Sequence, residues 1–168
     1  MIKTAADHGY STDLLSSVER VNAAQKSSLV RKVKARFGDD LEGRVFGVWG
    51  LAFKPETDDM REAPAIEIIT ALTDAGAKVK AYDPKAMDIA REVYLKGNNQ
   101  VKYCDGKYDV LKEADALLLI TEWKEFRSPD FSEIKKLLKE PVIFDGRNQY
   151  EADFLEKYGI EYHQIGKG

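Results

Sequence analysis

The sequence predicts an α/β fold, in which a parallel, Rossmann-like sheet is sandwiched by helices and preceded by a long N-terminal helix. Short apolar segments alternate with amphipathic ones from about residue 44 onward, which is typical of a parallel sheet with right-handed crossovers. Residues 116–120 read Ala-Leu-Leu-Leu-Ile, and such an unbroken apolar run indicates a strand covered on both faces. Residues 12–37 show helical spacing instead.

The elements can be assigned in order along the chain. The first helix is predicted over residues 12–37 and ends before Gly38. Strands are predicted over residues 44–49, 77–82, 101–104, 115–120, 141–144 and 160–164. Helices between them are predicted over residues 64–75, 85–95, 107–113, 130–139 and 151–158. We therefore expect a helical region over residues 1–38 and a Rossmann-like domain over residues 39–168.

Composition excludes several classes of protein. The 168 residues are enough for a substantial core, and the net charge of −3 argues against a nucleic-acid partner. No apolar run approaches the roughly 20 residues of a membrane span, and the N-terminal residues do not read as a signal peptide. The single cysteine, Cys104, argues against a cysteine-rich metal site. We expect a cytoplasmic protein without a membrane partner or a bound metal.

The loop after the first predicted strand carries the most informative motif. Residues 50–64 read Gly-Leu-Ala-Phe-Lys-Pro-Glu-Thr-Asp-Asp-Met-Arg-Glu-Ala-Pro, and a helix is predicted to begin at Pro64. Ligands of open α/β sheets bind at the carboxyl ends of strands, and helix N-termini attract anions. Lys54 and Arg61 would add two positive charges beside such a site. The alternative for each is an ordinary solvated cation on a loop.

The same loop lacks the G-x-G-x-x-G pattern of dinucleotide-binding domains. Gly50 either lets the backbone approach a ligand or only permits a tight turn. Asp83, after the second predicted strand, could bind a ribose hydroxyl. Without the glycines we prefer a capping role for Asp83, with Pro84 starting the next helix. The sequence thus predicts that NAD is not held here in the usual way.

Two further motifs follow later strands. Residues 119–123 read Leu-Ile-Thr-Glu-Trp, and residues 143–148 read Ile-Phe-Asp-Gly-Arg-Asn. Arg147 in the second motif should lie at the carboxyl edge of the sheet, where arginine suits oxyanions and vicinal hydroxyls. A structural pair with Asp145 is the alternative for Arg147. Trp123 either packs in the core, which we prefer, or shapes a pocket.

These three motifs, in their order and spacing, resemble the UDP-glucose/GDP-mannose dehydrogenase family of nucleotide-sugar dehydrogenases over residues 5–167. The resemblance implies that Phe53, Lys54 and Arg147 contact the UDP-sugar. It also implies that Arg61 reaches an NAD cofactor bound mainly by another domain. The Thr-Glu-Trp motif is similar to that of family members acting on UDP-glucose, and members acting on UDP-N-acetylmannosamine tend to lack it.

The resemblance also implies which parts lie elsewhere. Family enzymes are more than twice as long, with an N-terminal NAD-binding domain and a catalytic cysteine in a G-G-S-C-F-P-K-D segment. Neither feature occurs here, and Cys104 lies in a different context. The resemblance therefore identifies the chain as a C-terminal UDP-binding domain that holds no catalytic residue and is inactive alone.

The partners implied for this domain are UDP-glucose or UDP, the NAD-binding domain of the same enzyme, and a second copy in a homodimer. The whole enzyme would oxidise UDP-glucose to UDP-glucuronate with two NAD. The alternatives are a free-standing nucleotide-binding or regulatory module, and the same domain from a dehydrogenase of another UDP-sugar.

Overall fold

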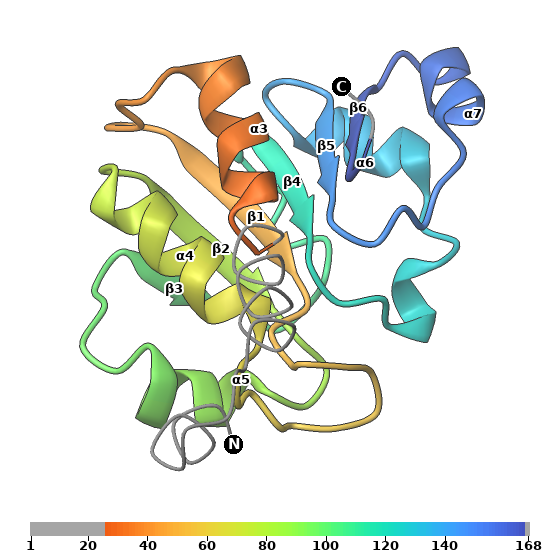
Figure 1. Cartoon of the computed structure of the whole chain (residues 1–168). Coiled ribbons are helices and arrows are strands. Elements are labelled where there is room, and N and C mark those ends of the chain that lie inside the picture. The colour runs from red at the N-terminus through yellow and green to blue at the C-terminus, as the bar shows by residue number, and fades with distance from the viewer. Residues whose placement is uncertain (1–25, 167–168) are drawn as a thin grey trace, which may run out of the picture.

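The computed structural model describes residues 26–166 and confirms the predicted α/β sandwich (Figure 1). Its first described helix, α3 (Ser28–Phe37), ends at Gly38, as the sequence predicts. Of the helix predicted over residues 12–37, residues 12–25 lie outside the described part of the chain. The proposed division of the chain after residue 38 stays a prediction.

All six described strands pair in parallel, in the order β3-β2-β1-β4-β5-β6. The strands are β1 (Val45–Trp49), β2 (Lys78–Tyr82), β3 (Val101–Tyr103), β4 (Ala116–Leu119), β5 (Val142–Asp145) and β6 (Glu161–Gln164). β2 and β3 lie on one side of β1, and β4, β5 and β6 lie on its other side. The β1–β4 pair is therefore the topological switch point, where open α/β sheets bind ligands.

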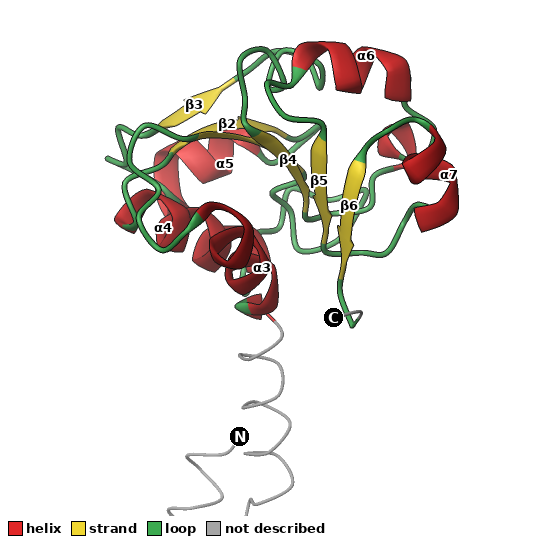
Figure 2. Ribbon diagram, turned by 90° about the horizontal axis from the view of Figure 1, so that it is seen from above, coloured by secondary structure: helices red, strands yellow, loops and turns green. Residues whose placement is uncertain are grey.

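Helices cover both faces of this sheet, as the continuous burial of β4 requires. Figure 2 shows α3 and α4 (Pro64–Asp74) on one side and α6 (Phe131–Leu137) on the other. The helix predicted over residues 85–95 is α5 (Met87–Ile89) continued by a π-helical turn. The remaining helical elements are a 3₁₀ turn at Lys124–Phe126 and α7 (Ala152–Lys157).

The helix predicted over residues 107–113 is wrong, because this segment forms consecutive turns. Its backbone hydrogen bonds join residues three positions apart, whereas those of an α-helix join residues four apart. One example runs from the Asp109 N–H to the Gly106 carbonyl oxygen at 3.0 Å. The Lys107 carbonyl oxygen instead accepts the indole N–H of Trp49 at 2.6 Å. A long-range contact thus takes an acceptor that a helix would have used.

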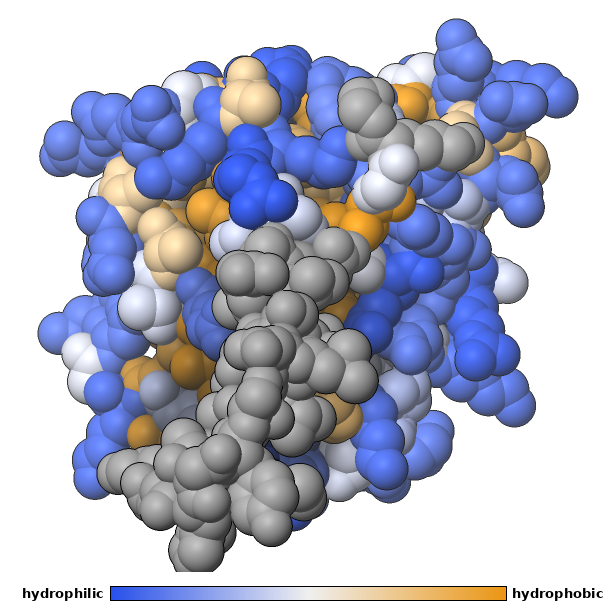
Figure 3. Space-filling view, viewed as in Figure 1, coloured by the Kyte–Doolittle hydropathy of each residue, from blue (hydrophilic) through white to orange (hydrophobic). Residues whose placement is uncertain are grey.

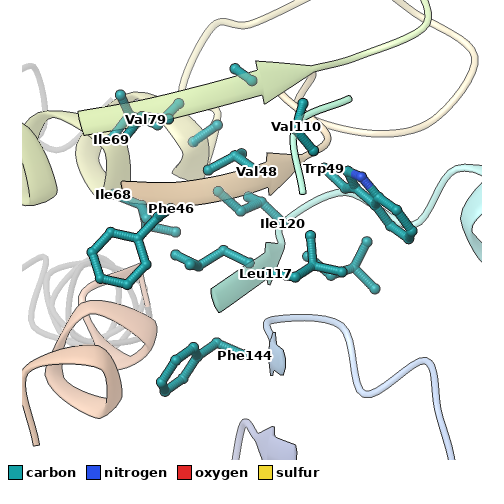
Figure 4. Close-up of a cluster of buried hydrophobic side chains, with 14 of the residues drawn as sticks. Phe46, Val48, Trp49, Ile68, Ile69, Val79, Val110, Leu117, Ile120 and Phe144 are labelled. Atoms are coloured by element: carbon teal, nitrogen blue, oxygen red, sulfur yellow. The ribbon is translucent and has the colours of Figure 1, made fainter. Parts of the chain in front are cut away.

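The core lies on both faces of the central strands (Figure 4). Trp49, at the carboxyl end of β1, is fully buried and stacks on Phe126 with ring centroids 4.9 Å apart. Trp123 is also buried, at 3 % exposure, which confirms the preferred packing role. This packing fixes the carboxyl ends of β1 and β4, from which the functional loops start.

Polar and charged side chains cover most of the described part of the face in Figure 3, and apolar side chains show only between them. None of the helices within residues 26–166 is long and apolar enough to cross a bilayer.

Candidate functional site

Three loops meet at the carboxyl edge of the sheet beside the switch point, and they carry the predicted sugar-nucleotide residues. Phe53 and Lys54 follow β1, and Arg147 follows β5. The Arg147 guanidinium crosses between the loops: its Nε donates to the Ile120 carbonyl oxygen at 2.8 Å, and its Nη2 donates to that of Phe53 at 3.4 Å. The Arg147 Nε also lies 2.9 Å from Oε2 of Glu122. The structure therefore joins Phe53 and Arg147, although they are far apart in sequence.

The side chains at this edge remain accessible. Phe53 is 47 % exposed, which is unusual for a large apolar residue in this chain. The Arg147 side chain keeps 32 % of its surface exposed. Lys54 is exposed and forms no hydrogen bond or ion pair with any residue between 26 and 166. The two loops that Arg147 joins thus carry an exposed aromatic ring and two exposed cationic side chains, groups that suit a ligand with both a ring and negative charge.

Arg61 lies further along the loop after β1, just before α4, and its bonds go to Asp59. Its Nε donates to Asp59 Oδ1 at 3.0 Å and its Nη2 donates to Oδ2 at 2.7 Å. The hydrogen bond from the guanidinium lowers the pKa of Asp59 to about 2 and raises the pKa of Arg61. Asp59 also accepts the Arg61 backbone N–H at 2.9 Å and so helps to organise the loop. The Arg61 side chain is 80 % exposed, so it faces solvent rather than the loops around Arg147.

Asp83 holds the start of the loop after β1. Its buried carboxylate, 1 % exposed, accepts the N–H groups of Leu51 at 2.7 Å and Ala52 at 3.1 Å on Oδ2. The predicted capping role is confirmed in part, since Oδ1 accepts two N–H groups in the turn before α5. Both oxygens are thus engaged by the protein, and neither is presented to a ribose hydroxyl. That NAD is not held here in the usual way stays a prediction, and the bonds of Asp83 agree with it.

Gly50 makes the close approach of the β1 and β4 loops possible. Its φ is 92°, and a Cβ at this position would lie 2.5 Å from the Cβ of Thr121. The Thr121 hydroxyl donates to the Ala52 carbonyl oxygen at 2.6 Å and so fastens the two loops together. Gly50 thus permits a close approach by a neighbouring loop of the same chain, and the choice between the two predicted alternatives stays a prediction.

Asp145 holds the loop after β5 in the same manner. It is fully buried, and its Oδ1 accepts the backbone N–H of Arg147 at 2.7 Å. Its Oδ2 accepts the Gln149 N–H at 2.7 Å and the Tyr162 hydroxyl at 2.6 Å. Burial and this hydrogen bond raise the pKa of Tyr162. The predicted alternative, a side-chain pair between Arg147 and Asp145, is wrong, because the guanidinium turns toward Ile120 and Glu122 instead.

Two residues of the site were not predicted as such from the sequence. Glu122 is the ion-pair partner of Arg147, and Thr121 ties the β4 loop to the β1 loop. Both belong to the Thr-Glu-Trp motif, which follows β4. Because β4 ends at the carboxyl edge of the sheet, the position of this motif could have predicted that both residues lie near the site.

Other candidate chemistry is weak in the described residues. Cys104 is buried, and burial raises the pKa of its thiol, which disfavours the reactive thiolate. Within residues 26–166, no group of three His, Cys, Asp or Glu side chains is arranged to hold a metal ion.

A parallel sheet of this strand order, with an aromatic ring and cations on loops at its switch point, defines a Rossmann-like nucleotide-binding domain. The chain matches the UDP binding domain of the UDP-glucose/GDP-mannose dehydrogenase family over residues 47–152. It therefore belongs to this family.

Individual relatives agree with that assignment. The chain is 43% identical to a UDP-glucose 6-dehydrogenase of Rhizobium meliloti over 99% of its own length and 37% of the relative's. It is 38% identical to the UDP-glucose 6-dehydrogenase TuaD of Bacillus subtilis. Its structure is similar to that of a UDP-glucose dehydrogenase from Pyrobaculum islandicum, with a TM-score of 0.80, 30% identity, and coverage of 99% of this chain and 35% of that one. The chain thus spans little more than a third of the length of these relatives.

Proposed function

We propose that this chain binds UDP and UDP-glucose at the carboxyl edge of its sheet, as the C-terminal domain of a UDP-glucose 6-dehydrogenase. The observation that carries the proposal is the hydrogen bond from Arg147 to the Phe53 carbonyl oxygen, at 3.4 Å, in a member of this family. It brings the loop that carries Phe53 and Lys54 next to Arg147. These residues come from loops after different strands, and the bonds of Arg147 hold those loops together.

Each of the three residues has a chemical role toward such a ligand. Lys54 forms no hydrogen bond or ion pair with residues 26–166 and would bind a diphosphate or sugar oxygen directly. Arg147 can offer a planar pair of N–H donors to oxyanions or vicinal hydroxyls. It must first give up part of its interaction with Glu122, 2.9 Å away. Phe53 would cover an apolar face of the ligand with its exposed ring.

The choice of UDP-glucose rests on the Thr-Glu-Trp motif and on the relatives. Relatives that are 43%, 39% and 38% identical carry the name UDP-glucose 6-dehydrogenase. A solved UDP-D-ManNAc dehydrogenase from Pyrococcus horikoshii is 25% identical and has a TM-score of 0.63. This difference supports glucose as the sugar over N-acetylmannosamine.

In the whole enzyme, we infer that this domain anchors the UDP part while the sugar is oxidised elsewhere. Binding energy from a remote part of a substrate positions its reacting atoms. NAD would supply the hydride acceptor, and the exposed Arg61 guanidinium would reach toward it from the edge of this domain. The remaining partners are the NAD-binding domain of the same enzyme and a second copy in a homodimer. We expect the chain alone not to oxidise UDP-glucose.

Titration of the isotopically labelled chain with UDP, followed by NMR, tests the proposed site. Amide signals of residues 50–54 and 146–148 should shift and saturate together. Uridine is the matched ligand control, because it keeps the base and ribose but lacks the charges that Lys54 and Arg147 would bind. Absence of shifts in both loops at high millimolar UDP would contradict the proposal.

A further inference from the structure

One buried carboxylate links the loops that carry the candidate site. Five N–H donors from three chain segments converge on Asp83: Leu51 and Ala52 after β1, Lys85 and Ala86 after β2, and the Trp123 indole after β4. All five distances lie between 2.7 and 3.1 Å. No lysine or arginine within residues 26–166 pairs with Asp83. Its negative charge is therefore stabilised by N–H groups, a role in which carboxylates form short, strong hydrogen bonds.

The two carboxylate oxygens serve different parts of the fold. Oδ1 binds the N–H groups of Lys85 and Ala86, at 2.9 and 2.8 Å, and so closes the turn before α5. Oδ2 binds the Leu51 and Ala52 N–H groups and the Trp123 indole, at 3.0 Å for the indole. Only the second oxygen acts on the candidate site.

The groups bound by Oδ2 adjoin the residues that would hold the ligand. Leu51 and Ala52 immediately precede Phe53, and Trp123 immediately follows Glu122, the partner of Arg147. Because the donors are held by a single oxygen atom, the loop after β1 and the loop after β4 cannot move independently. The spacing between Phe53 and the Arg147 guanidinium depends on both loops.

We propose that Asp83 is a positioning residue of the UDP site: it does not touch the ligand, but it fixes the Leu51 and Ala52 peptides so that Phe53 and Lys54 face Arg147. The proposal rests on the proposed function. In effect, the acidic position that follows β2 serves here as an internal anchor for the loop after β1. A pre-organised loop binds more tightly because less conformational freedom is lost on binding.

Asp115 provides a matched control for a merely structural role. It is also a buried carboxylate, 5 % exposed, and it accepts a β1 N–H group, that of Val45 at 2.7 Å. It lies at the opposite end of the strand, where it also pairs with Arg44. Asp115→Ala should therefore destabilise the domain without disturbing the carboxyl edge.

The experiment compares Asp83→Ala, Trp123→Phe and Asp115→Ala in the full 168-residue chain. UDP affinity is measured by calorimetry, amide hydrogen exchange by NMR, and stability by urea unfolding. Asp83→Ala should weaken UDP binding about tenfold or more, and Trp123→Phe, which removes one donor, about threefold. In both variants the Leu51 and Ala52 amides should exchange faster relative to the Val48 amide. Asp115→Ala should lose stability and keep its UDP affinity.

The outcomes separate this proposal from the proposed function. A folded Asp83→Ala variant that binds UDP as tightly as the unaltered chain would overturn the positioning role. If Asp83→Ala does not fold, Trp123→Phe decides, and unchanged affinity with unchanged exchange at Leu51 and Ala52 would overturn it. If the unaltered chain does not bind UDP, the proposed function fails, whereas faster exchange in the variants would still support the anchoring of the loop.

Discussion

The two ends of the sheet use their charged side chains in different ways. At the amino edge, before the strands begin, cations pair with carboxylates: Arg36 bonds to Glu140 at 2.8 Å and Glu161 at 3.0 Å, and Arg44 bonds to Asp115 at 3.0 Å and Glu140 at 3.2 Å. These ion pairs link α3 and the segments before β1, β4 and β5 to one another and to β6. The cations Arg36 and Arg44 at the amino edge are therefore paired with carboxylates of the same chain.

At the carboxyl edge, the buried carboxylates Asp83 and Asp145 accept N–H and O–H groups and form no ion pair with a lysine or arginine of residues 26–166. Asp83 fixes the loop after β1, and Asp145 fixes the loop after β5. Because these carboxylates are satisfied by N–H groups, they do not neutralise the cations on the loops. Within residues 26–166, Lys54 forms no hydrogen bond or ion pair, and the one ion pair of Arg147 is with the partly exposed Glu122. The buried carboxylate Asp115 thus pairs with a cation at the amino edge, and Asp83 and Asp145 anchor loops at the carboxyl edge.

The largest expected effect comes from the close contact at the carboxyl edge. Gly50→Ala should lower the free energy of unfolding by about 2–4 kcal/mol, because it places a Cβ against Thr121 and requires a left-handed backbone of a residue with a side chain. Urea unfolding measures this loss. Gly43→Ala is the control, since Gly43 shares the positive φ but has open space around it. Equal losses in the two variants would contradict the steric explanation.

Removing a cation of the candidate site should weaken UDP binding more than it lowers the stability of the fold. Lys54→Ala and Arg147→Ala should each weaken UDP binding about tenfold to a hundredfold, since a charge-assisted hydrogen bond contributes about 1.5–3 kcal/mol. The free energy of unfolding should change little for Lys54→Ala, because this exposed side chain forms no hydrogen bond or ion pair with residues 26–166. Calorimetric titration checks the affinity. Lys136→Ala, at an exposed position on α6, is the control and should bind UDP normally.

Removing an amino-edge cation should have the reverse effect. Arg44→Met should lower the free energy of unfolding by about 1–2 kcal/mol, because it leaves the buried Asp115 without its nearer cation. UDP affinity should stay unchanged. Loss of UDP affinity in a folded Arg44→Met variant would show that the two edges do not divide these roles.

The exposed pair of Asp59 and Arg61 should give the smallest effect, visible as a pH dependence. The pKa of Asp59 is lowered from 3.8 to about 2, so its interaction with Arg61 is fully present above about pH 4 and is lost as the pH falls through about 2. NMR titration of the Asp59 carboxyl carbon measures this pKa. In Arg61→Ala it should return toward its usual value of about 4. An unchanged pKa in that variant would exclude Arg61 as the cause.

Local patterns predicted most of the fold because strands and helices here follow their own apolar spacing. Each predicted strand lies within a residue or two of an observed one, as with residues 77–82 and Lys78–Tyr82. The failure at residues 107–113 has a non-local cause, because the Trp49 indole takes the carbonyl oxygen of Lys107. A contact between residues so far apart in sequence cannot be predicted from the residues of segment 107–113 alone.

For the candidate site, the sequence predicted the positions of its loops, and the binding roles of its residues stay predictions. The motifs placed Lys54 and Arg147 after strands, and strand order then brings their loops together. The roles of Asp83 and Glu122 depend on which loops meet across the switch point, so the sequence alone assigned Asp83 only to its local turn. The assignment of Arg61 to the cofactor remains a prediction.

A crystal structure of the chain with UDP tests the division between the two edges most directly. The diphosphate should lie within hydrogen-bonding distance of Lys54 Nζ and the Arg147 guanidinium, with the Arg147–Glu122 pair loosened and the Arg44–Asp115 pair unchanged. A diphosphate bound at the amino edge, or one bound without contact to either Lys54 or Arg147, would contradict the account.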